Sequence, residues 1–365
     1  MHPTTAALIC AIDPVLRSAT AFNIATTLPA SAAVVFSFSN DGALTYSLMD
    51  AHGLRGSEPI ELSGECLSCA SLEALTMTVL DLAGHYRYLG IFPPLGFDPL
   101  PLARTLTEAS DHTPLTLATV TSLVDAHTAA DDLFGTTRAA ERGLAGLGND
   151  LTIAEALMNQ IAFADVIITH GPTNAGTEVV EHLQAHDCLL ARDIHDDAAT
   201  RLVFQGHHDP LNAFARIDPC CTQPWGGPST YGTWTLDLHS DRPFHPARLL
   251  DNIELLGAGK LLHRGRFWVP TRPHTLCSWE GAGGQVSVGV VGAMAPGTRH
   301  STRLTIIGQG NERGRLERAF RDSLLTDAEW AYAPSHWREL VSSTGDGLEP
   351  WLGDLEPGSG DMEVH

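Results

Sequence analysis

The sequence has almost no lysine. Of the 22 lysine and arginine residues in its 365 positions, only Lys260 is a lysine. A phosphate-binding loop of the form GxxxxGK[ST] needs a lysine to neutralise the phosphates and a hydroxyl to hold Mg²⁺. Lys260 is followed by Leu261, and Glu254 stands where such a loop would begin with glycine. The sequence therefore contains no intact loop of this kind, and a guanine-reading NKxD motif is excluded by the same count.

Long hydrophobic runs and a disulfide framework are also missing. No window approaches 18 consecutive apolar residues, so we expect no membrane-spanning helix. The seven cysteines are odd in number, only one pair is separated by two residues, and the N-terminus lacks a basic leader. This usage is typical of reduced thiols, and we expect a cytoplasmic protein.

Basic charge is scarce overall and unevenly placed. The net charge of −21 argues against DNA or general nucleic-acid binding by the whole chain, because phosphates would be repelled. Residues 241–330 nevertheless carry 12 Lys and Arg against 9 Asp and Glu, a balance of +3. A basic module of this kind suits RNA or an acidic protein partner, and ordinary surface variation is the alternative.

Strand and helix patterns alternate through residues 1–208. Asp13 and Pro14 are suited to cap and begin a helix over 13–28. Short apolar runs between helices are typical of a parallel sheet covered on both faces, so the pattern predicts an α/β domain with a mostly parallel sheet. The expected strands are 5–12, 31–39, 88–96, 118–125 and 164–172, and a further helix is expected over 71–86.

Three more segments follow. Residues 209–232 are rich in proline, glycine and aromatic residues and predict a linker. Residues 233–332 alternate strand patterns with amphipathic helices and predict a smaller α+β domain; Leu316, Phe320 and Leu324 share one helix face. Residues 333–365 are acidic and rich in glycine and proline, and we expect this tail to be disordered.

Several short motifs resemble a known family. The second domain is similar to the CobW C-terminal domain, and the first is similar to the nucleotide-binding half of CobW-like GTPases and zinc metallochaperones. The resemblance implies a P-loop-NTPase-like domain followed by a CobW C-terminal domain. It rests on RPFHPARLLDNI, GKLLHRGRFWVPTRP, CSWEGAGG, RLTIIGQG and LLTDAEW in the second domain, and on VTSLVDAHT and QIAFADVIITH in the first.

The nucleotide motifs of this family are degenerate here. Its phosphate loop, GxxGxGKT, aligns with residues 11–18, which contain no glycine. Those glycines allow backbone N–H groups to surround phosphates. The guanine-recognition motif aligns with 169–172 without lysine or aspartate, and 92–96 carry no Walker-B acid. The departures predict no productive GTP hydrolysis and leave binding of GTP with Mg²⁺ in doubt. Weak nucleotide binding through Arg17 and Ser18 stays open.

The metal motif is better retained. The family's Cys-x-Cys-Cys zinc motif corresponds to Cys66-Leu67-Ser68-Cys69, in which serine replaces the middle cysteine. Two thiolates remain at the CxxC spacing of tetrahedral zinc sites, so we predict Zn²⁺ binding at Cys66 and Cys69. Two ordinary small residues at a helix start, or a redox dithiol, are the alternatives.

A CxxC pair supplies only half of a tetrahedral site. Candidates for the other ligands are Glu65, a histidine from a distant segment or a partner chain. The chain has 18 histidines, and His207 and His208 are the only adjacent pair. Spacing does not choose among them.

The resemblance leads to a first functional hypothesis and an alternative. One branch of the family has CxxC and a degenerate P-loop, and recruits a ribosome hibernation factor when zinc is scarce. The first hypothesis is accordingly a non-hydrolysing, zinc-responsive adaptor in zinc homeostasis, with the ribosome or a hibernation factor as partner. The alternative is a GTP-dependent zinc metallochaperone that delivers metal to a client protein. A ferredoxin-like interaction module beside an inert domain is a third possibility.

Overall fold

The chain forms two compact units. A computed structural model describes residues 3–39, 42–62, 66–144, 151–221, 224, 226–294, 301–332, 336–337 and 345–355. The first unit comprises Met1–Ile217 and Trp225–Thr233, and the second comprises Asp218–Pro224 and Trp234–His365. Within the predicted linker, residues Pro210–Ile217 form helix α8 of the first unit.

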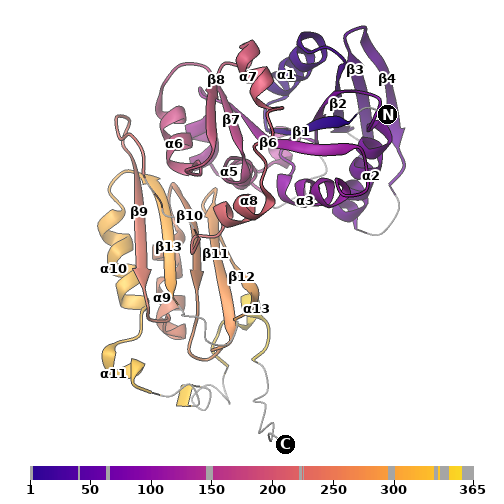
Figure 1. Cartoon of the computed structure of the whole chain (residues 1–365). Helices are drawn as coiled ribbons and strands as arrows, with labels where there is room; N and C mark the ends of the chain where they lie inside the picture. The colour runs from indigo at the N-terminus through magenta and orange to yellow at the C-terminus, as the bar shows by residue number, and fades with distance from the viewer. Residues whose placement is uncertain are drawn as a thin grey trace, which may run out of the picture. The chain divides into compact units, whose positions relative to one another are not determined.

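The first unit is built on an eight-stranded sheet in the order β4-β3-β2-β5-β1-β6-β7-β8 (Figure 1). Neighbouring strands in the series β2-β5-β1-β6-β7-β8 pair in parallel. Strands β3 and β4 extend the sheet beyond β2 with antiparallel pairing. This confirms the predicted mostly parallel α/β sheet. The strands are β1 (Thr4–Ala11), β2 (Ser31–Phe38), β3 (Leu44–Asp50), β4 (Gly53–Ile60), β5 (Tyr88–Phe92), β6 (Leu115–Asp125), β7 (Val166–His170) and β8 (Leu189–Arg192).

Helices cover both faces of this sheet. Because side chains alternate along a strand, β1 supplies Leu8 to one core and Ile9 to the other, which explains why its residues 6–11 are all apolar. Helices α2 and α3 pack on the first face, and α1 and α7 on the second (Figure 1). The helices are α1 (Pro14–Thr27), α2 (Leu67–Leu82), α3 (Pro99–Ala109), α4 (Ala129–Phe134), α5 (Ile153–Phe163), α6 (Ala175–Leu183) and α7 (Asp197–Leu202).

The second unit is a five-stranded sheet with helices α9 and α10, in the order β12-β11-β10-β13-β9. Strand β10 pairs antiparallel with β11 and β13, and β11 with β12. Its core is centred on the fully buried Trp279, and the predicted helix face of Leu316 and Phe320 packs into it. The predicted α+β class is confirmed. The elements are β9 (Thr233–Ser240), α9 (Pro246–Gly257), β10 (Leu261–Phe267), β11 (Thr275–Ala282), β12 (Gln285–Ala293), β13 (Thr302–Gln309), α10 (Arg313–Ser323) and α11 (Asp327–Trp330).

Part of the acidic tail is folded, which corrects the expectation of disorder for residues 345–355. Leu348 and Leu352, the latter in helix α13 (Glu349–Leu352), are buried in the core of the second unit. The Asp346 carboxylate accepts bonds from the Arg272 guanidinium at 2.9 and 3.0 Å and from the Thr271 hydroxyl at 2.7 Å. The Arg272–Asp346 ion pair and the buried Leu348 and Leu352 side chains therefore order a segment that its composition predicts to be disordered.

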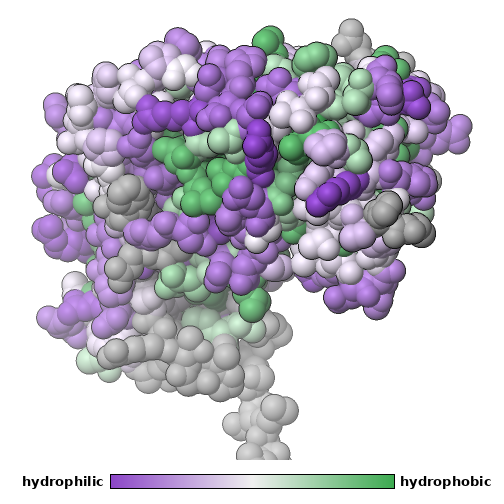
Figure 2. All heavy atoms as spheres, turned by 45° about the horizontal axis from the view of Figure 1, so that its top comes forward, coloured by the Kyte–Doolittle hydropathy of each residue, from purple (hydrophilic) through white to green (hydrophobic). Residues whose placement is uncertain are grey.

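Hydrophilic side chains dominate the face shown in Figure 2, with hydrophobic side chains gathered between them. Exposed apolar residues of the first unit include Val15 and Phe22 on α1 and Leu67 and Met77 on α2. Within the part of the chain that the structure describes, every helix is too short or too polar to cross a bilayer.

Candidate functional site

The two predicted metal ligands lie together at the start of α2. Cys66 is the N-cap residue, and Cys69 lies in the first helical turn. Residues three apart in a helix face the same side, so the thiols share one end of α2. Both cysteines are exposed. The helix begins four residues earlier than the predicted 71–86, which places Cys69 within it.

The environment of the pair favours one thiolate. Hydrogen bonds from Ser68, whose Oγ lies 3.2 Å from Cys66 Sγ, and from Cys69 lower the pKa of Cys66 to about 7. A hydrogen bond with Cys66, and the negative charge of its thiolate, raise the pKa of Cys69. A helix N-terminus also favours negative charge. The thiolate is the form that binds a metal, so this pair presents one ready ligand and a second that loses its proton on coordination.

The thiols supply two ligands and no more among the described residues. No group of three or more His, Cys, Asp or Glu side chains suited to a metal occurs in the described ranges. Glu65 lies outside those ranges. His208, a candidate from the sequence, has its Nδ1 2.9 Å from a buried carboxylate oxygen of Asp165 and is itself buried. The donors present fit Zn²⁺ in chemical type, and a complete tetrahedral site needs further ligands from elsewhere.

Residues 11–18, which the sequence analysis aligns with the phosphate loop of the family, contain a helix start that the chain caps with its own side chain. Asp13 is the N-cap of α1, and its carboxylate accepts a hydrogen bond from the Leu16 N–H at 2.7 Å. Pro14 opens the helix and has no N–H to offer. The N-terminus of a helix is a natural site for an anion, and here the chain's own carboxylate takes that place. Asp13 and Pro14 thus act as the sequence predicts.

The Arg17 side chain is held inside the protein. Its guanidinium is turned into the protein and only 8% of the residue is exposed. It donates to the carbonyl oxygens of Phe36 at 3.0 Å and Pro93 at 3.4 Å, and to Ser37 Oγ at 3.1 Å. Burial lowers the pKa of Arg17. The Ser18 hydroxyl donates to the Pro14 carbonyl at 2.7 Å, within α1.

A small cavity of about 90 Å³ borders this segment, and three of the residues that line it are acidic. Asp13, Asp125 and Asp132 contribute carboxylates, and among the described lining residues Arg142 is the one base. Arg142 is ion-paired with Asp132, which is buried. Among the described lining residues, no basic side chain pairs with Asp13 or Asp125. Their negative charge makes the electrostatic potential of the cavity unfavourable for a triphosphate.

Residues 92–96 and 169–172, which the sequence analysis aligns with the other two nucleotide motifs, make contacts within the protein. The Phe92 side chain is fully buried, and the Pro93 carbonyl is bonded to the Arg17 guanidinium. At the end of β7, His170 Nδ1 lies 3.5 Å from an Asp193 oxygen, and its ring meets that of His195 at a centroid distance of 5.8 Å.

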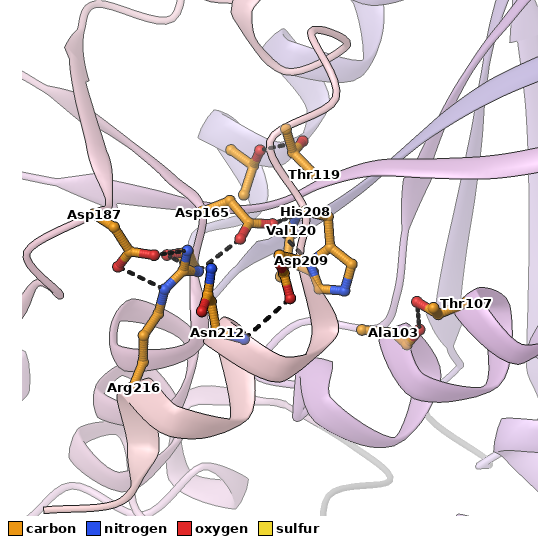
Figure 3. A network of polar contacts seen from close by, with 12 residues as sticks. Ala103, Thr107, Thr119, Val120, Asp165, Asp187, His208, Asp209, Asn212 and Arg216 are labelled. Atoms are coloured by element: carbon orange, nitrogen blue, oxygen red, sulfur yellow. Dashed lines mark hydrogen bonds and ion pairs between the residues drawn. The ribbon is translucent and has the colours of Figure 1, made fainter. Parts of the chain in front are cut away.

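A buried polar network in the first unit has a structural role. Figure 3 shows Asp165, His208 and Arg216 directed toward one another. Asp165 accepts from the Val120 N–H at 2.7 Å and from Arg216 at 2.6 Å, and Arg216 also binds Asp187 at 2.6 Å. The network ties α8 to the sheet. Its members lie 43 and 51 residues from Asp165, so no local sequence pattern predicts it.

The second unit contains a CobW C-terminal domain. Residues 233–324 match the family model described as "Cobalamin synthesis protein cobW C-terminal domain". Over 248 residues, the chain is 25% identical to "Zinc chaperone Rv0106" of Mycobacterium tuberculosis and, equally, to "Uncharacterized protein Mb0109" of Mycobacterium bovis. The match spans 59% of this chain and about 60% of the length of these relatives. The chain is therefore a distant homologue of a protein described as a zinc chaperone.

A solved structure, the Zn(II)-bound YjiA GTPase from E. coli, is also similar. It has a TM-score of 0.38 and 16% identity, and the match covers 88% of this chain and 99% of the other.

Proposed function

We propose that this protein binds zinc through Cys66 and Cys69 and acts in zinc homeostasis without hydrolysing GTP. The observation that carries the proposal is the exposed thiol pair at the start of α2, in a unit whose phosphate-loop equivalent is capped by its own Asp13. The homologue's description as a zinc chaperone supports the metal. The inward direction of Arg17 supports the absence of turnover.

Metal content tests the first part. The full chain and a Cys66→Ser, Cys69→Ser variant are purified with zinc, and bound metal is measured by mass spectrometry. We expect one zinc per chain, lost in the variant, because thiolate ligands contribute most of the affinity of such a site. The matched control is Cys220→Ser, Cys221→Ser, which alters another exposed pair and keeps the metal. Equal zinc in the chain and the first variant would reject the assignment.

The finer function that we propose is an adaptor that recruits a ribosome hibernation factor when zinc is limiting. Exposure of the two thiols supports a role that responds to the supply of zinc, because the site is open to exchange of its metal. The positive balance of residues 241–330 supports an RNA or acidic protein surface as the partner. Co-sedimentation with ribosomes at low and high zinc is the test. We expect association at low zinc, and absence from ribosomes in both conditions would refute this role.

A GTP-dependent zinc metallochaperone is the second candidate, favoured by the description of the homologue. Phosphate release from GTP, with and without zinc, separates it from the adaptor. Turnover above background that is lost in Arg17→Ala would establish the chaperone, whereas we expect no turnover.

A further inference from the structure

Cys66 and Cys69 occupy two helix positions whose side chains meet. Cys66 is the N-cap of α2, with extended backbone angles of φ −98° and ψ 107°, and Cys69 is the third residue of the helix. Side chains at these two positions reach toward each other, as they do in a capping box. The start of α5 shows the same pair of positions in contact, because Thr152 Oγ1 lies 2.9 Å from Glu155 Oε2. The CxxC spacing at this helix start therefore brings two sulfur atoms together.

The two thiols are in contact and open to solvent. A hydrogen bond joins the side chains of Cys66 and Cys69, and Ser68 Oγ lies 3.2 Å from Cys66 Sγ. Residues 66–69 are all exposed, so a small molecule in solution can reach both sulfur atoms. Bonding between the two sulfur atoms requires the pair to be close, and it requires access for an oxidant. Both conditions are met at the start of α2.

The other five cysteines, all of which lie among the described residues, are not arranged for bridging. Cys10 and Cys277 are buried and belong to different units, and Cys188 is half-buried. Cys220 and Cys221 are exposed, but they are adjacent in the chain. Adjacent Cα atoms lie about 3.8 Å apart, which is less than the roughly 4.4–6.8 Å usual between the Cα atoms of bridged cysteines. This adjacent pair is therefore a matched control for the CxxC pair.

We propose that Cys66 and Cys69 undergo thiol–disulfide exchange with small disulfides, and that the disulfide they form prevents zinc binding. In the first step, the thiolate of one cysteine attacks a sulfur atom of R–S–S–R, a mixed disulfide forms, and RS⁻ leaves. The thiolate of the second cysteine then attacks the sulfur atom of the first, which closes the Cys66–Cys69 bond and releases the second RS⁻. The two leaving groups take up the two thiol protons. The chain thus loses two electrons and two protons, and R–S–S–R is reduced to two molecules of R–SH.

Zinc and the disulfide exclude each other because both use the same two sulfur atoms. A metal bond requires a thiolate, and a bridged pair has none to offer. The exchange reaction itself needs no metal, so it goes beyond the proposed function, and only its effect on zinc rests on the binding proposed above. The chain that has lost zinc is the form that is open to oxidation.

Oxidised glutathione is the probe for the exchange reaction. The full chain is stripped of metal with a chelator and incubated with oxidised glutathione, and the remaining free thiols are blocked with N-ethylmaleimide. We expect peptide mass spectrometry to find a Cys66–Cys69 disulfide that dithiothreitol reverses. In Cys66→Ser or Cys69→Ser, the reaction should stop at a glutathione adduct on the cysteine that remains. The control variant Cys220→Ser, Cys221→Ser should form the Cys66–Cys69 disulfide as the original chain does.

The same measurement with zinc examines the link to the metal. The zinc-loaded chain should form the disulfide roughly tenfold or more slowly, and the oxidised chain should bind no zinc. If the metal-free chain is folded by circular dichroism but forms no Cys66–Cys69 disulfide, the exchange proposal is overturned and zinc binding stands. If the disulfide forms in a chain that binds no zinc when reduced, the proposed function fails and the exchange stands. Equal rates of oxidation with and without bound zinc would overturn the exclusion of one by the other.

Discussion

Replacement of Arg17 by methionine separates a structural role from a phosphate-binding role. Methionine keeps the apolar stem and removes the donors to Phe36, Ser37 and Pro93. Two carbonyls lose a buried donor, at about 1–3 kcal/mol for each group left without a partner. Part of this is offset because a buried cation with only neutral partners is removed, as the lowered pKa of Arg17 indicates. We expect a net destabilisation of about 1–3 kcal/mol.

Thermal unfolding and nucleotide binding are measured on the same samples. The destabilisation should lower Tm by about 2–4 °C for each kcal/mol in a unit of this size. A fluorescent GTP analogue should give the same signal with the original chain and with Arg17→Met. Ser18→Ala is the control and should change neither property, since that hydroxyl bonds only within α1 and is exposed. An Arg17→Met chain of unchanged stability that has lost measurable GTP binding would refute this view of the loop.

Other predictions concern buried polar groups. Trp279 donates its indole N–H to Nδ1 of His263, whose buried ring has a pKa of about 4 against an ordinary 6.5. Below pH 6.5 the His263 ring binds a proton in the unfolded chain but stays neutral in the folded chain. The free energy of unfolding should therefore fall by about 3 kcal/mol between pH 6.5 and 4. In urea unfolding followed by tryptophan fluorescence, an equally steep loss in His263→Gln would contradict this. Asp346→Asn should cost about 3–5 kcal/mol by leaving Arg272 buried without a counter-charge, and an unchanged urea midpoint would argue against that. Asp165→Asn should cost less in the first unit, about 1–3 kcal/mol measured by circular dichroism in urea, because Arg216 keeps its ion pair with Asp187. If the urea midpoint of Asp165→Asn shifted no more than that of an Asp→Asn change at an exposed position, the network would not contribute to stability as proposed.

Local sequence signals were sufficient for most of the fold. The cap and proline at Asp13 and Pro14 predicted the start of α1, and apolar runs predicted the strands, because these depend on neighbours in the chain. The direction of Arg17 was not predictable, because it depends on carbonyls 19 and 76 residues away. The order of residues 345–355 depends likewise on an ion pair between positions 74 residues apart.

The candidate site was predictable in part. The CxxC spacing identified the thiol pair, whereas the helix predicted over 71–86 begins four residues earlier, so that both thiols lie at the start of α2. The contact between the thiols was not foreseen, because it requires that the helix begin between them, whereas the apolar periodicity of the sequence starts only at Leu72. Zinc binding itself remains a prediction from the motif.

The Asp13 cap has a consequence for any attempt to return nucleotide chemistry to this scaffold. A lysine or a glycine introduced into residues 11–18 would still face a helix start whose positive end is already neutralised within the chain. A phosphate-binding loop would require removal of the Asp13 carboxylate and a residue with a free N–H in place of Pro14. If Arg17 were also replaced, the carbonyls of Phe36 and Pro93 would need a new hydrogen-bond donor. Replacement of Arg17 removes hydrogen bonds to the sheet, and replacement of Asp13 or Pro14 weakens the start of α1. Each of these substitutions alone would therefore lower stability without creating affinity for phosphate.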